Sequence, residues 1–159
     1  MNWSFDITLK TRAILYKFLD NFSLEQLNIV PNGYQNSIYW NIMHVVVTQQ
    51  LLVYGLSSVP MLIDSDRIDA FRKGTKTEND ASMEDVDKLK DLLFSTIEQT
   101  QRDYAAKIFT NYTNYTVSTK STLTNVEEAI EFNNFHEGIH LGYILAMKNT
   151  INHTNQDEI

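Results

Sequence analysis

Residues 86–108 read VDKLKDLLFSTIEQTQRDYAAKI, and the apolar positions in this stretch follow the period of an α-helix. The repeating face comprises Val86, Leu89, Leu93, Ile97, Thr100, Tyr104 and Ile108. These positions recur at steps of three and four residues, so they line one side of a helix. Just upstream, Ser82 is followed by Asp85, a spacing that is typical of a capped helix N-terminus. The stretch therefore predicts a long amphipathic helix that begins after Ser82.

Three further segments have the pattern of long helices. Residues 4–20 place apolar side chains, among them Ile14, Leu15 and Phe18, at steps of three to five, with lysine, arginine and aspartate between them. Residues 37–56 are apolar around almost the whole circumference, which indicates a helix that is buried on most sides. A capping box formed by Thr124 and Glu127 is expected to open the last helix, which continues to Ile151. Four long helices without repeats or alternating strands predict an all-α fold, a four-helix bundle.

The segments between these helices predict short elements and turns. Ser23-Leu24-Glu25-Gln26 has the form of a capping box and predicts a short helical turn. Residues 64–73 are expected to form a short helix that Gly74 ends, and residues 111–124 an ordered loop with a short extended piece. A chain of 159 residues is long enough for one core. We therefore expect a single domain over residues 1–151 and a polar tail over residues 152–159.

Composition excludes several classes of function. The net charge of −7 arises from acidic groups spread along the chain, and no cluster of lysine and arginine could neutralise successive phosphates, so we expect no nucleic acid partner. No segment offers the ~18 apolar residues that span a bilayer. The start of the chain lacks a secretion signal, so we expect a cytoplasmic protein without membrane contact. The chain has no cysteine, so any thiol in its chemistry must come from another molecule.

The histidines are the residues most suited to chemistry. His136 and His140 are four residues apart in the last predicted helix, which places their rings on one face within ~6 Å. Neutral imidazole is the commonest nitrogen ligand for zinc, nickel and iron. His44, in the buried second helix, is the obvious third ligand. A lone histidine on an apolar face is more often a hydrogen-bonded core residue, but three in the two most apolar helices favour a divalent metal site.

His136-Glu137-Gly138-Ile139-His140 also matches the H-E-x-x-H pattern of zinc proteases, in which the glutamate is the general base. Only 19 residues follow His140, which leaves no downstream helix for a third ligand, and the extended metzincin pattern is absent. A protease is therefore not favoured. Because Glu137 lies ~100° around the helix from His136, we expect it to support the ligands indirectly or to lie at the surface.

Two glycines, Gly138 and Gly142, share one face of the same helix. Each costs ~1 kcal/mol against alanine in a helix, so a close approach of another helix or of a ligand is a reasonable compensation. We expect tight packing within the core at these positions.

Two stretches of the sequence resemble the DinB-like superfamily, close to the DinB/YfiT-type metalloenzymes. They are YWNIMHVVVTQQLL at residues 39–52 and FHEGIHLGYIL at residues 135–145. One histidine on the second helix followed by H-x-x-x-H on the last is the feature that carries the resemblance. It implies an up-down-down-up four-helix bundle, often a homodimer, in which His44, His136 and His140 bind a divalent metal and leave its other positions to water or substrate.

Relatives in this superfamily include thiol transferases that use bacillithiol, mycothiol-dependent isomerases and metal-dependent hydrolases. The resemblance therefore implies a small-molecule substrate but not one reaction. The first hypothesis is an S-transferase in which a low-molecular-weight thiol such as bacillithiol attacks an electrophile. The second is a hydrolase that uses metal-activated water, with Glu137 or Tyr143 assisting proton transfer. The third is a noncatalytic dimeric module in which the metal is structural.

Overall fold

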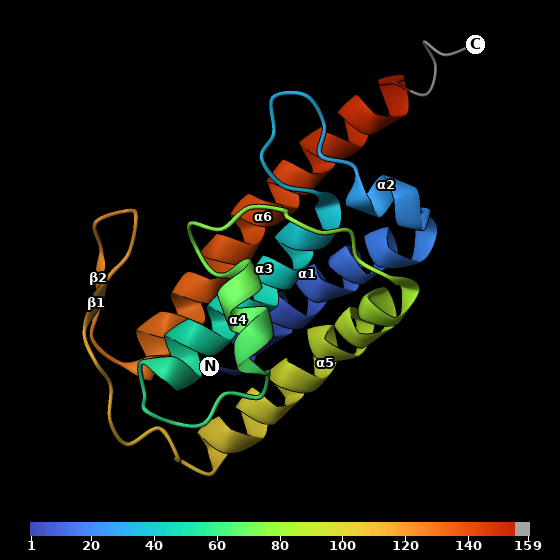
Figure 1. The fold of residues 1–159 in the computed structure, drawn as a ribbon. Helices are drawn as coiled ribbons and strands as arrows, with labels where there is room; N and C mark the ends of the chain where they lie inside the picture. Colours follow the sequence, from blue (N-terminus) through green and yellow to red (C-terminus); the bar gives the residue numbers. More distant parts are fainter. Residues whose placement is uncertain (155–159) are drawn as a thin grey trace.

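Four long helices form the frame of the protein in a computed structural model that describes residues 1–154 (Figure 1). They are α1 (Asn2–Asn21), α3 (Ile38–Gln50), α5 (Met83–Ala105) and α6 (Val126–Thr154). Both α1 and α3 pack against α5 and against α6. In Figure 1, α1 and α6 run from lower left to upper right, and α3 and α5 run in the opposite direction. The all-α class expected from the sequence is therefore confirmed.

Short elements connect the long helices. They are α2 (Leu24–Asn28), the π-helical turn η1 (Leu51–Gly55), α4 (Ser65–Phe71), β1 (Tyr115–Thr116) and β2 (Thr122–Leu123). The turn η1 continues α3 directly, so residues 38–55 form one continuous helical segment, as the sequence predicted. The two strands pair antiparallel, with Tyr115 opposite Leu123, and form the extended piece expected in this loop. Within residues 1–154, no helix has both the length and the apolar character required to cross a membrane.

The caps of the helices agree with the sequence at two places and differ at one. The capping boxes at Ser23 and Ser82 are both formed. The box expected between Thr124 and Glu127 is wrong by one residue. Asn125 accepts the backbone N–H of Glu128, and the Glu128 carboxylate accepts from the backbone and hydroxyl of Thr124. Asparagine caps a helix as well as threonine does, so the side chain that reaches the free N–H takes the role.

The ends of two helices also differ from the expectation. Helix α5 ends at Ala105, three residues before Ile108, and Lys107 follows in a left-handed conformation with φ of 58°. Helix α6 continues to Thr154, beyond the expected boundary at Ile151. The remainder of the expected polar tail, residues 155–159, lies outside the described residues.

Helix α3 lies in the centre of the bundle. Every residue from Ile38 to Val47 is buried, which agrees with the apolar circumference of this segment. Two polar side chains, Asn41 and His44, are buried among them. In α1 the apolar period predicts Leu15 and Phe18 correctly as core residues, whereas Ile14 is 42% exposed. A buried polar group must find hydrogen-bond partners, so the burial of Asn41 and His44 indicates that a polar site lies beside α3.

Candidate metal centre

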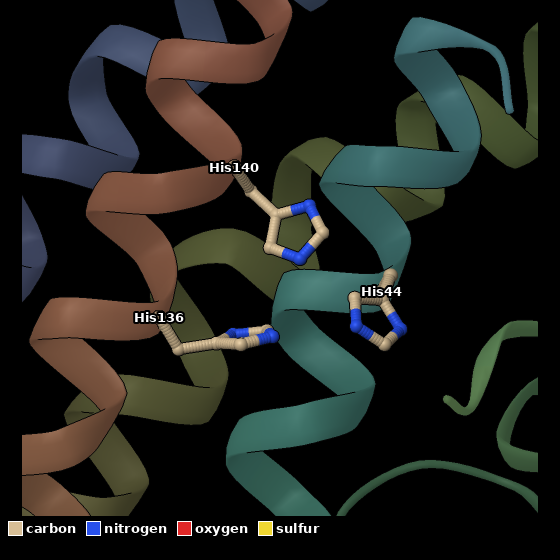
Figure 2. Close-up of side chains that lie close together, drawn as sticks. All are labelled: His44, His136 and His140. Atoms are coloured by element: carbon tan, nitrogen blue, oxygen red, sulfur yellow. The ribbon is translucent and has the colours of Figure 1, made fainter. Parts of the chain in front are cut away.

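Three histidine rings from two helices meet between α3 and α6. His44 comes from α3, and His136 and His140 lie one turn apart on α6. One nitrogen from each ring lies within 4.8 Å of the corresponding nitrogens of the other two. Figure 2 shows the rings pointing toward a common space between the two helices. The residues that the sequence singled out thus form a group that could hold one metal ion.

Hydrogen bonds orient two of the rings. Nδ1 of His44 donates to the carbonyl oxygen of Phe71 at 2.6 Å, and Nδ1 of His140 donates to Oδ1 of Asn41 at 2.9 Å. The amide of Asn41 is itself fixed, because its Nδ2 donates to the carbonyl oxygen of Ser37 at 2.8 Å. Both acceptors require a proton on Nδ1, which leaves Nε2 of each ring unprotonated, with a lone pair that can bind a metal. This arrangement is typical of metal-binding histidines, whose second nitrogen is anchored by an oxygen.

The plane of the His44 ring is fixed by an aromatic neighbour. Trp40 lies one turn earlier on α3 and stacks on this ring, with centroids 4.7 Å apart and an interplanar angle of 11°. The hydroxyl of Thr48, one turn later, lies 3.3 Å from Nε2 of His44. Three consecutive turns of α3 therefore hold this imidazole in one orientation, so little side-chain freedom is left to lose when it binds a ligand.

Burial keeps the three rings neutral. It lowers the pKa of His136 to about 3, and charges on the adjacent His140 and His44 rings act in the same direction. Burial, followed by the neighbouring His44, lowers the pKa of His140 to about 4. The pKa of His44 is also lowered by burial, although its hydrogen bond to Phe71 acts against this. Neutral imidazole is the form that binds a metal, so the histidines are ready to bind at neutral pH.

Nδ1 of His136 is buried without a hydrogen-bond partner among the described residues, and such a polar group is costly unless a further contact satisfies it.

A cavity of about 610 Å³ adjoins the histidines. All three rings line it, together with residues of η1, of β1 and of the segment that follows α4. Its walls are mainly apolar side chains, and no aspartate or glutamate in the part of the chain that the structure describes lines it. This volume is in the range of small-molecule binding sites. A small molecule in this cavity would therefore lie against the open side of the three-histidine group.

The Glu137 carboxylate is directed toward Arg12 of α1, so the surface position, one of the two roles expected for it, is wrong. Its carboxylate is fully buried and accepts two hydrogen bonds from the Arg12 guanidinium, at 2.9 and 3.1 Å. Asn133, one turn earlier, donates to the same oxygen at 2.7 Å. Arg12 also reaches the hydroxyl of Thr96, so the pair joins α1, α5 and α6. Glu137 is thus a structural residue, and the zinc-protease role of this glutamate is absent.

The two glycines of α6 are not packed in the core, contrary to the expectation. Both Gly138 and Gly142 are exposed, and a Cβ added at either position would meet nothing within 4 Å. They lie beside Phe135 and Ile139, which are 52% and 51% exposed. These four residues and Ala146 form one apolar stripe, here called the α6 outer stripe. The glycines would therefore permit another molecule, rather than a helix of the same chain, to pack closely against this stripe.

Sequence reasoning missed the residues that support the histidines. Asn41 is three residues before His44, and a polar side chain inside so apolar a helix was a usable signal. The Phe71 carbonyl carried no such signal, since backbone atoms are the same at every position. Lys73, which lines the cavity, is one of several lysines in polar segments and could not be distinguished from them.

Comparison with known proteins places the chain in a family. No curated protein matches the sequence. The family model described as DinB superfamily matches residues 8–144, which include all three histidines and most of the four long helices. The resemblance noted from residues 39–52 and 135–145 is thereby confirmed, and the chain belongs to the DinB superfamily.

Proposed function

We propose that this protein is a metal-dependent enzyme in which His44, His136 and His140 hold one divalent ion, either zinc, nickel or iron. The observation that carries the proposal is the open side of the histidine group, which faces the apolar cavity. A divalent metal held there would supply Lewis-acid chemistry, in particular the stabilisation of a thiolate or hydroxide at neutral pH. The chain's own residues orient the ligand rings, keep them neutral and exclude water from the apolar wall.

The number of ligands favours an enzyme over a noncatalytic module. Structural zinc sites use four protein ligands, whereas catalytic sites use three and leave a position open. Within residues 1–151, whose side chains the structure describes, the potential metal-binding group comprises three histidines and no carboxylate. A fourth position would therefore be available to a small molecule from the cavity.

The reaction that these surroundings support best is the S-transferase reaction, with a low-molecular-weight thiol such as bacillithiol. Hydrolysis requires a group that accepts a proton from water. Glu137, the nearest carboxylate in sequence, is buried and bound to Arg12, and no carboxylate of the described residues lines the cavity. A thiol needs less assistance, because its ordinary pKa of about 8.5 is far below that of water. The thiol would lose its proton to solvent, and its sulfur would form a bond to carbon of an electrophilic substrate as the leaving group departs with the electron pair of the broken bond.

We expect the single variants His44→Ala, His136→Ala and His140→Ala to lose both bound metal and thiol-dependent turnover. Wild type purified without chelator or nickel column should contain about one divalent ion per chain. Each variant should bind it at least ~100-fold more weakly, because two imidazoles hold an ion far less tightly than three. Asn41→Ala, which keeps all three ligands, should weaken binding by only ~10- to 100-fold. Elemental analysis and the consumption of a test thiol with an alkyl halide measure the two properties.

Two results would contradict parts of this proposal. Wild type without metal, or metal retained in all three histidine variants, would exclude the site. Metal-dependent ester cleavage without any thiol, together with no thioether formation, would replace the transferase with a hydrolase.

We also propose that the protein forms a homodimer through the α6 outer stripe. The stripe lacks charge, it exposes Phe135 and Ile139 to half of their surface, and its glycines allow two helices to approach closely. A two-fold axis would place the stripe against its own copy, which is the usual arrangement in homodimers.

Gly142→Arg is expected to convert the dimer to a monomer, because a long charged side chain would lie in the closest part of the interface. Light scattering should report twice 18.4 kDa for wild type and 18.4 kDa for the variant. Ser95→Arg, at an exposed position of α5, is the matched control and should remain dimeric. A monomeric wild type, or a dimeric Gly142→Arg variant, would show that this face is not the interface.

A further inference from the structure

The cavity beside the histidines carries a charge opposite to that of the whole protein. The chain has a net charge of −7, yet among the described residues the only charged side chain that lines the cavity, histidines aside, is Lys73. Much of the remaining wall is apolar and consists of Leu51, Leu52, Leu56, Val117, Phe132 and Ile139. The cavity thus combines one cation with a water-excluding surface.

Lys73 is placed at the cavity by the same segment that orients His44. Helix α4 ends at Phe71, whose carbonyl oxygen binds the His44 ring, and Lys73 follows two residues later. Gly74 comes next with φ of 94°, a left-handed conformation that turns the chain after the lysine. Among residues 1–151 the Lys73 ammonium makes no ion pair or hydrogen bond, whereas Lys10 and Lys88 each bind a carboxylate. Its charge is therefore available to a bound molecule.

We propose that the cavity takes a small molecule that joins an apolar body to one anionic group, with Lys73 as the residue that selects the anion. The inference rests on the proposed function, since it treats the cavity as the substrate pocket of that site. A purely polar anion would leave the apolar wall in contact with water. A cation would be repelled by Lys73, and a neutral apolar molecule would gain no electrostatic attraction from the lysine charge. A molecule with both parts matches both features of the wall.

Two dyes with the same ring system test this assignment on the full chain, with and without added Zn²⁺. Anilinonaphthalene sulfonate carries an anionic group, and N-phenylnaphthylamine lacks it. Lys73→Met should lower the affinity for the sulfonate dye about fivefold, which corresponds to the loss of one partly exposed charge pair. Its affinity for the neutral dye should stay within about twofold of wild type. Lys73→Arg, which keeps the charge, should bind both dyes as wild type does. Lys76→Met is the matched control, because Lys76 is exposed and does not line the cavity.

The ratio of the two affinities decides the result. If Lys73→Met lowers the affinity for both dyes equally, the lysine is structural, and if it changes neither, the lysine does not contact the anion. Each of these outcomes would overturn the proposal. Dye binding requires neither metal nor turnover, so its failure is distinguishable from a failure of the metal analysis.

Discussion

Arg12→Met is expected to destabilise the protein by about 3–5 kcal/mol, one of the largest effects of any single substitution in this chain. Arg12 and Glu137 are both fully buried, and the guanidinium supplies two of the three hydrogen bonds that Glu137 accepts. Methionine fills similar space but leaves the carboxylate buried without its counter-ion. The free energy of unfolding from urea titration, or a fall of roughly 10 °C in Tm, measures the loss.

Two further variants separate the buried charge from a general effect of the substitution. Lys10→Met lies two residues earlier on α1 and removes a salt bridge to Asp6 whose partners are 72% and 49% exposed. It should cost less than about 1 kcal/mol. The double variant Arg12→Met/Glu137→Leu removes both charges and should recover much of the lost stability. A single Arg12→Met variant as stable as Lys10→Met would show that the pair contributes nothing.

Arg12 illustrates where sequence reasoning fails in this fold. The apolar period of residues 4–20 identifies Leu15 and Phe18 as core, because hydrophobic side chains at helical spacing must share a buried face. The same reasoning places an arginine on the solvent side. Its partner lies 125 residues away in the chain, so no local pattern could show that this charge is compensated. Periodicity therefore predicts the helix but not the polar network that joins three of the helices.

The three-histidine group was more predictable because its information is mostly local. The spacing of His136 and His140 places both rings on one face of any helix, whatever the tertiary structure. The position of His44 opposite them needed the packing of α3 against α6, which the family resemblance implied. The cavity could not be predicted, because it depends on η1 and on the β1–β2 hairpin. An apolar run such as residues 51–55 carries no signal that distinguishes a π-helical turn from an α-helix.

Acid should destabilise the metal-free protein strongly between pH 7 and pH 5, well before its carboxylates titrate. The folded-state pKa values of His136 and His140, about 3 and about 4, lie below the ordinary histidine value near 6.5. In this window the unfolded chain binds protons that the folded chain does not, so the stability present above pH 6.5 is lost as the pH falls. Each of the two rings contributes about 2 kcal/mol to the loss, and His44 acts in the same direction.

Urea titrations in the presence of a chelator at pH 7, 6 and 5 measure this loss, and a histidine variant assigns it. In His136→Gln the unfolded chain no longer takes up a proton at position 136. About 2 kcal/mol of the pH-dependent loss in the free energy of unfolding should therefore disappear. The carboxylates of Asp64 and Asp85 have pKa values below their ordinary range, so they lose their contribution only at lower pH. An equal loss of stability in wild type and in His136→Gln would therefore show that groups other than His136 cause the pH dependence. With Zn²⁺ present, proton uptake must compete with the ion for the same nitrogens, and the acid transition should move to lower pH.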